Sequence, residues 1–299
     1  MTQNISHRDG QIPGQGGLSL YWQTWRAEPA PPAPGPTVVI VHGFAEHSTR
    51  YVEVAKVLAD RGCTVYAIDH RGHGRSAGRR AFIDSLDNVV ADMDQLVEMA
   101  RREQPGSRLI LLGHSLGGGL SLEYAIRHQE KLDALILSGP LASLQTASTF
   151  VVQVSKILSS VAPTLGVLAL DPSATSRDPA EVEAYVNDPL NFIGKMPART
   201  GGVVVRLVQG LPARLGTLTL PLLIMHGKED TLTSPAGSEM VMRTVRSPDK
   251  TLLVYEGLRH EIFKELRADR DRVFADLTAW IDARFAVAVP AATVQAGTA

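Results

Sequence analysis

The sequence has little cysteine, little net charge and no long uninterrupted apolar run. Its single cysteine among 299 residues, Cys63, excludes an intrachain disulfide and a thiolate metal cluster, and its apolar surroundings predict a buried, inert thiol. Thirty Lys and Arg residues balance 31 Asp and Glu residues, for a net charge of −1. Because no global field then favours polyanions, nucleic acid is not an expected partner.

The sequence also lacks a recognisable leader or membrane span. Residues 1–17 are polar and glycine-rich, without the basic start and apolar run of a secretory signal. The most apolar stretch, residues 149–170, is interrupted by Gln153, Lys156 and Pro163, whereas a spanning helix needs about 20 consecutive apolar residues. We therefore expect a cytoplasmic protein, and leave open a membrane association through this stretch.

Short β-branched runs alternate with longer runs of helical periodicity, which is typical of parallel strands joined by crossover helices. This order predicts an α/β protein with a mostly parallel, doubly wound sheet. The expected strands are 37–42, 64–69, 108–112, 134–138, 221–226 and 251–255, and the expected helices are 51–61, 88–104, 118–128 and 269–285.

The alternation stops between about residues 140 and 219, which predicts an insertion into the sheet domain. We place the core at residues 18–140 and 218–285, and a helical cap or lid at residues 141–217. Residues 1–17 and 286–299 carry no clear periodicity, so we expect poorly ordered tails there. The oligomeric state is not predicted.

A glycine-flanked serine follows the third expected strand. Residues 113–117 read Gly-His-Ser-Leu-Gly, between a strand and a helix, which is the context of a nucleophile elbow. Glycine two positions either side allows neighbouring backbones to pass closely while the serine hydroxyl projects outward. Ser115 is therefore the candidate nucleophile, and the alternative is a plain glycine-rich turn.

A serine nucleophile needs a base to accept its proton and a carboxylate to orient that base. In sheets of this kind the chain order is serine, acid, histidine, each on a loop after a strand. Asp230 follows the strand 221–226, with Glu229 and Asp249 as rivals, and His260 is the only histidine after the last expected strand. We predict a triad of Ser115, Asp230 and His260.

Acyl transfer also needs two donors for the developing oxyanion. The amide of Leu116 follows the nucleophile, and the amide of Phe44 lies in the loop after the first expected strand, so these two are the candidates. The sequence shows neither metal-ligand spacing such as H-E-x-x-H nor a phosphate-binding glycine motif. We expect no metal and no cofactor.

Three segments together resemble the monoacylglycerol lipase branch of the α/β-hydrolase superfamily. They are H-G-F-A-E-H at residues 42–47 with Arg-Tyr at 50–51, D-H-R-G-H-G-R-S at residues 69–76, and the elbow at 113–118. The first two are narrower signatures than the elbow. The resemblance extends over about residues 18–285 and is weakest in the insertion.

The resemblance implies a cap with an apolar channel for one acyl chain and a small polar end for a glycerol moiety. The residues assigned to the channel are Phe150, Val154, Ile157 and Leu158, on an apolar stripe that could equally cover the core. Those assigned to the polar end are Glu46, His47 and Arg50, for which a loop-organising role is the alternative. Mammalian members carry a cysteine just after the triad acid, where this chain has Thr233, so thiol sensitivity is not carried over.

The leading functional hypothesis is a serine esterase that hydrolyses a small lipid ester such as a monoacylglycerol, with transient contact between the cap and a membrane or micelle. A broad carboxylesterase and a lysophospholipase are the alternatives within catalysis. A non-catalytic ligand-binding homologue is the alternative from another class, because fold alone does not determine function.

Overall fold

The computed structural model describes residues 4–29, 35–144, 153 and 157–285. Its eight-stranded sheet has the order β1-β2-β4-β3-β5-β6-β9-β10. The strands are β1 Asn4–Pro13, β2 Ser19–Glu28, β3 Thr37–Val41, β4 Thr64–Ile68, β5 Leu109–His114, β6 Ala134–Ser138, β9 Leu222–Gly227 and β10 Lys250–Tyr255. All neighbours from β4 to β10 pair in parallel, so the expected mostly parallel α/β sheet is confirmed.

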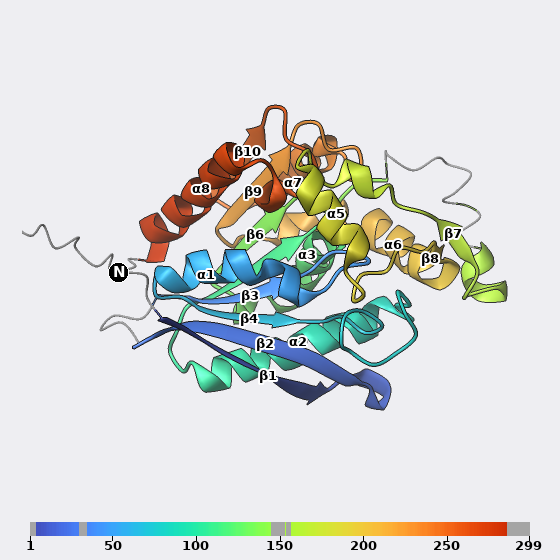
Figure 1. Cartoon of the computed structure of the whole chain (residues 1–299), viewed down its shortest axis with the longest axis horizontal. Coiled ribbons are helices and arrows are strands. Elements are labelled where there is room, and N and C mark those ends of the chain that lie inside the picture. The colour runs from blue at the N-terminus through green and yellow to red at the C-terminus, as the bar shows by residue number, and fades with distance from the viewer. Residues whose placement is uncertain (1–3, 30–34, 145–152, 154–156, 286–299) are drawn as a thin grey trace, which may run out of the picture.

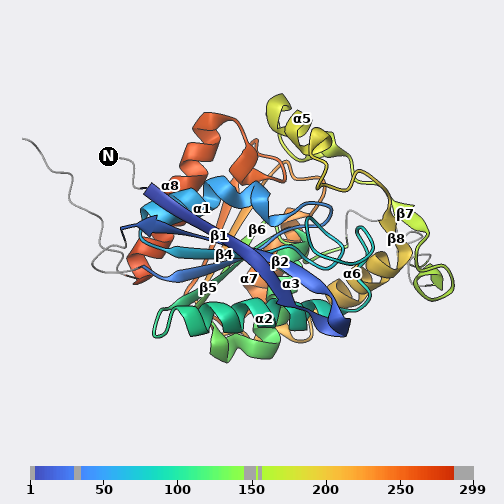
Figure 2. The same ribbon diagram turned by 60° about the horizontal axis from the view of Figure 1, so that its bottom comes forward.

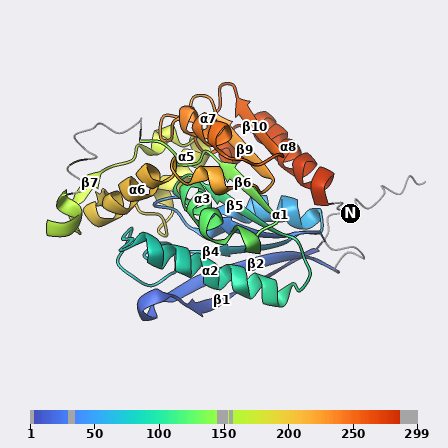
Figure 3. The same cartoon turned by 180° about the vertical axis from the view of Figure 1, so that it is seen from behind.

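Helices cover both faces of the sheet (Figures 1 and 3). One face carries α1 Val52–Asp60 and α8 Arg267–Phe285, and the other carries α2 Leu86–Glu103, α3 Leu116–His128 and α7 Pro235–Thr244. Figure 2 shows the sheet between these two layers. Short 3₁₀ turns are η1 Gln15–Gly17, η2 Ser48–Tyr51, η3 Gln129–Lys131, η5 Leu215–Thr217 and η6 Ile262–Lys264.

The two helical layers make two hydrophobic cores, one on each face of the sheet. Alternate residues of each central strand supply them: Val39 and Val41 belong to the core beneath α2 and α3, and Val38 and Ile40 to the core beneath α1 and α8. A strand buried on both faces has no solvent side, which explains its continuous apolar run. Cys63 is buried among the second set, and burial raises the pKa of its thiol to about 12.

The expected poorly ordered N-terminal tail is wrong for residues 4–13. They form β1, which pairs antiparallel with β2 from Asn4 opposite Glu28 to Pro13 opposite Ser19. Because β1 is an edge strand with mostly exposed side chains, it lacks the apolar alternation by which strands are recognised. The sheet therefore begins with an antiparallel pair that the periodicity did not indicate.

The segment between β6 and β9 contributes no described strand to the main sheet and lies at one end of it (Figure 1). It contains β7 Gly166–Leu168, η4 Pro172–Ala174, α5 Pro179–Asn187, β8 Met196–Pro197 and α6 Ala198–Gly210, with β7 and β8 paired antiparallel. Leu207 of α6 is fully buried in the core beneath α3. We call residues 141–217 the cap. None of the described helices has the length and apolar content to cross a bilayer.

Candidate active site

The sharp turn between β5 and α3 places Ser115 in a backbone conformation that few residues adopt. Its φ is 54° and its ψ is −121°. A Cβ on Gly117 would lie 2.1 Å from the Val41 carbonyl oxygen, and one on Gly113 would lie 2.4 Å from Ser121 Oγ. Glycine at both positions therefore lets β3 and α3 approach the turn while Ser115 faces a cavity.

Asp230 and His260 come together from the loops after β9 and β10. His260 Nδ1 donates to Asp230 Oδ2 over 2.6 Å, and both side chains are buried. The other oxygen, Oδ1, accepts from the amides of Leu232 and Thr233 at 2.8 and 2.9 Å. These amides fix the carboxylate, and the carboxylate fixes the imidazole with its proton on Nδ1, which leaves Nε2 free to act as a base.

The pair also shifts the protonation of both groups. Burial disfavours the charged form of each, but the ion pair outweighs it. The pKa of Asp230 is held far below its usual range, with a further contribution from a hydrogen bond to His226, and the pKa of His260 is raised above 6.5. Asp230 therefore stays ionised during turnover and stabilises the imidazolium that forms when His260 accepts a proton.

A second histidine, His226 at the end of β9, contacts the same carboxylate oxygen. Its Nε2 lies 3.0 Å from Asp230 Oδ2 and 3.1 Å from the Thr233 carbonyl, and its Nδ1 lies 2.7 Å from Ser238 Oγ. Both groups near Nε2 are acceptors only, so Nε2 carries the proton and donates. His226 thus supports the orientation of Asp230.

Ser115 and His260 line one cavity beneath the cap. Its empty volume is about 990 Å³, including space open to solvent. No hydrogen bond joins Ser115 Oγ to His260 among the described residues, and such bonds in substrate-free enzymes often form fully only in the substrate complex. The apolar residues on the cavity wall are Phe44, Leu116, Leu141, Leu144, Val167, Leu168, Leu170, Met196, Val204, Val205 and Leu232.

The two expected oxyanion donors border this cavity. Leu116 is the first residue of α3, where amides have no acceptor within the helix, and Phe44 lies in the loop after β3. Ala45, next to Phe44, is buried with φ 68°, which costs a non-glycine residue about 1–2 kcal/mol. Glu46 Oε1 accepts from the Gly43 amide over 2.6 Å, so the loop is held from both sides of Phe44.

Comparison with known proteins decides the family. Residues 32–267 match the family described as serine aminopeptidase S33. A monoacylglycerol lipase of Mycolicibacterium smegmatis is 40% identical over 269 residues, which cover 90% of this chain and 94% of that protein. The chain belongs to the monoacylglycerol lipase-like family of serine hydrolases.

Two further family members agree with this assignment. Human monoglyceride lipase is 33% identical over 96% of this chain and 94% of its own length. A soluble variant of Saccharomyces cerevisiae monoglyceride lipase, solved in complex with a substrate analogue, superposes with a TM-score of 0.83 at 25% identity, over 95% of this chain and 96% of that one. The expected α/β-hydrolase fold is thereby confirmed.

Of the residues that the family resemblance assigned to the polar end, only Glu46 lines the cavity. Arg50 does not line the cavity. Its guanidinium donates to Glu46 Oε2 at 2.8 Å and to the two carboxylate oxygens of Glu261 at 2.8 and 2.7 Å. His47 is buried and pairs with Asp188 at 2.8 Å. The loop-organising alternative therefore describes Arg50 and His47 better than substrate contact does.

The assignment of the acyl channel to Phe150, Val154, Ile157 and Leu158 is wrong for Ile157 and Leu158, the two that the structure describes. Ile157 is 65% exposed, and neither Ile157 nor Leu158 lines the cavity. Phe150 and Val154 lie outside the described residues. The described cap residues on the cavity wall lie instead in residues 141–144, in β7, α5, β8 and α6, and in the segment between β7 and α5.

Sequence reasoning missed three groups at the site. No part in the triad was predicted for His226 or for Glu261, which is adjacent to His260 and lies on the cavity wall. Thr233, noted only as a replacement for cysteine, has its Oγ1 2.8 Å from Asp230 Oδ2 and 2.9 Å from the Gly139 carbonyl. The motif H-G-K-E-D at 226–230, directly after a strand, was the signal available for His226.

Proposed function

We propose that this protein hydrolyses monoacylglycerols, or acyl esters of similar shape, through an acyl-enzyme on Ser115. His260 accepts the proton of the Ser115 hydroxyl as its oxygen attacks the ester carbonyl. The amides of Phe44 and Leu116 stabilise the oxyanion, and His260 then donates the proton to the leaving glycerol oxygen. A water molecule, activated by His260 in the same way, attacks the acyl-enzyme and releases the fatty acid.

The observation that carries this proposal is the composition of the cavity at Ser115. One part of its wall is apolar and comes mainly from the cap, which suits an acyl chain, while Glu46 and Glu261 supply carboxylates near His260 that suit a hydroxyl-bearing leaving group. The 40% identity to a bacterial monoacylglycerol lipase supports the same substrate class.

A chain-length series tests the acyl part of the proposal. For monoacylglycerols from butyryl to lauroyl, kcat/KM should rise by up to about fourfold per methylene, since each buried methylene contributes about 0.8 kcal/mol. Ser115→Ala serves as the control for background hydrolysis. A profile that is flat, or highest for acetyl esters, would instead favour a broad carboxylesterase, and preference for a lysophospholipid would favour that alternative.

We also propose that the cap makes transient contact with a lipid aggregate. In the described part of the cap, five large apolar side chains are exposed: Ile157, Val161, Leu165, Val186 and Ile193. In an Ile157→Asp/Val161→Asp double variant, we expect a smaller fraction to sediment with phosphatidylcholine vesicles, while turnover of a soluble short ester is unchanged. Leu266→Asp is the matched control, because Leu266 is also exposed but lies in the sheet domain, outside the cap. Equal sedimentation of the wild type, the double variant and Leu266→Asp would contradict the proposal.

A further inference from the structure

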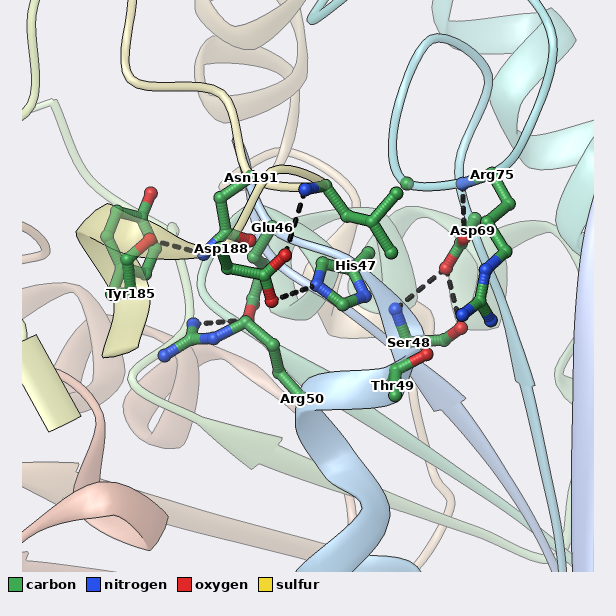
Figure 4. Close-up of polar contacts among 12 residues, drawn as sticks. Glu46, His47, Ser48, Thr49, Arg50, Asp69, Arg75, Tyr185, Asp188 and Asn191 are labelled. Carbon is green, nitrogen blue, oxygen red and sulfur yellow. Dashed lines mark hydrogen bonds and ion pairs between the residues drawn. The ribbon is translucent and has the colours of Figure 1, made fainter. Parts of the chain in front are cut away.

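The loop that carries Phe44 is held by the cap as well as by the core. We call residues 42–47 the oxyanion loop, and residues 188–192, after α5, the cap segment. His47 Nε2 lies 2.8 Å from Asp188 Oδ2, and the Phe192 amide donates to the Ala45 carbonyl over 2.9 Å. Figure 4 shows Asp188 between His47 and the chain of the cap segment.

The residue that follows the oxyanion loop, Ser48, is bound to the sheet domain through Asp69. Asp69 Oδ1 accepts from the amide and the hydroxyl of Ser48 at 2.7 and 2.5 Å, and Asp69 Oδ2 accepts from the Arg75 amide at 2.7 Å (Figure 4). The other end of the loop continues β3, whose residues are all buried. The part between these anchors, which includes the strained Ala45, is the part that the cap segment contacts.

Asp188 is built to make this contact. Its Oδ1 accepts from the Leu190 amide over 2.8 Å and so stabilises the turn in the cap segment, while its Oδ2 contacts His47 (Figure 4). Tyr185 at the end of α5 stacks over the Arg50 guanidinium at 4.7 Å, and its carbonyl accepts from Asn191 Nδ2 at 2.8 Å. Asp188 therefore joins the cap segment directly to the oxyanion loop, and Tyr185 adds a second contact through Arg50, which bonds Glu46 of that loop.

From this arrangement we infer that Asp188 is a positioning residue for the reaction. By binding His47 it keeps the cap segment against the oxyanion loop and so keeps the Phe44 amide directed at the developing oxyanion. The cap then contributes to the transition state as well as to substrate binding. This inference rests on the proposed function, because it takes the Phe44 amide as an oxyanion donor.

Asp188→Ala tests the inference with p-nitrophenyl acetate, an ester too short to fill the acyl part of the cavity. We expect kcat to fall about 10- to 100-fold, less than or comparable to the loss of one oxyanion donor, with KM nearly unchanged. Affinity for a trifluoromethyl ketone should fall in proportion, because its hemiketal oxyanion uses the same donors, while affinity for the corresponding alcohol should not change.

Glu181→Gln is the matched control. Glu181 lies on α5, as a second cap carboxylate paired with the core, at 3.5 Å from Lys264 and 3.4 Å from Arg270, but it does not contact the oxyanion loop. This variant should keep kcat and ketone affinity. A merely structural loss of cap–core pairing would affect both variants alike.

Asp188→Asn and His47→Gln keep the test decisive if the alanine variant does not fold. Each should lower kcat, and the double variant should be no worse than the more impaired single one, because both remove the same contact. Unchanged kcat and ketone affinity in Asp188→Asn and His47→Gln would overturn the inference. A wild-type protein without turnover of any ester would instead overturn the proposed function.

Discussion

Asp230→Asn is expected to lower kcat by about 10⁴-fold while the protein remains folded, as the same change does in serine protease triads. The amides of Leu232 and Thr233 hold Oδ1, so the bond to His260 Nδ1 and the donation from His226 both fall on Oδ2. An amide group cannot accept from all of these donors and carry the charge that stabilises the imidazolium. Turnover of a soluble ester, with thermal unfolding as a check on folding, measures the effect.

The rival acids provide the controls for this prediction. Glu229 is exposed, and Asp249 pairs with Arg284 at 2.6 and 2.7 Å, away from the cavity. Glu229→Gln and Asp249→Asn should keep kcat within about twofold of the wild type, as is usual for changes remote from the reacting atoms. Equal losses in Glu229→Gln and Asp230→Asn would contradict the assignment of the acid.

Acid should unfold the protein at a pH where most carboxylates are still ionised. Burial lowers the pKa of His70 to about 3 and those of His73 and His114 to about 4, and burial together with neighbouring histidines lowers the pKa of His42 well below 6.5. In the unfolded chain these groups titrate near 6.5. Below pH 6.5 the unfolded chain therefore takes up protons that these buried histidines do not bind in the fold, and the free energy of unfolding falls.

The sign follows from proton uptake on unfolding. Between pH 6.5 and about 4 the unfolded state binds up to four more protons at these histidines, so the free energy of unfolding falls by up to about 5.5 kcal/mol per pH unit, at about 1.4 kcal/mol per proton. His260 acts oppositely: its contribution is present below pH 6.5 and is lost as the pH rises through its raised folded pKa. Folded proteins typically have free energies of unfolding of about 5–15 kcal/mol, so a fall of this size per pH unit would unfold the protein within a few pH units.

Urea unfolding at several pH values between 7.5 and 4.5 measures this slope directly. His73→Gln removes one of the buried imidazoles, so the slope of the free energy of unfolding against pH should fall by the contribution of about one proton, roughly 1.4 kcal/mol per pH unit. A free energy of unfolding that stays constant from pH 6.5 to 4.5 would show that these histidines are protonated without cost, in conflict with their burial.

The sequence predicted the central part of the fold because its strands are covered on both faces. Segments such as 38–41 and 109–112 must then be continuously apolar, and the helices between them must carry one apolar stripe, so both patterns are visible in the chain. The edge strand β1 has one exposed side and polar residues, and its partner is known only when the sheet is assembled. Periodicity therefore could not indicate it.

Part of the site could likewise be predicted from the sequence, and part of it could not. Chain order and strand ends were enough to nominate Asp230 and His260, which the structure joins by a hydrogen bond. Contacts between distant segments, such as Asp188 with His47 or Arg50 with Glu261, depend on how the cap lies over the core, and no local pattern encodes them. The apolar stripe at 157–161 misled for that reason, since periodicity identifies an apolar face but not what covers it.

Covalent labelling with a fluorophosphonate, followed by peptide mass spectrometry, tests the triad of Ser115, His260 and Asp230 most directly. We expect one adduct, on Ser115, that forms more slowly in His260→Ala and Asp230→Asn and is absent in Ser115→Ala. An adduct on another residue, or labelling of Ser115→Ala at the wild-type rate, would contradict the assignment of the triad.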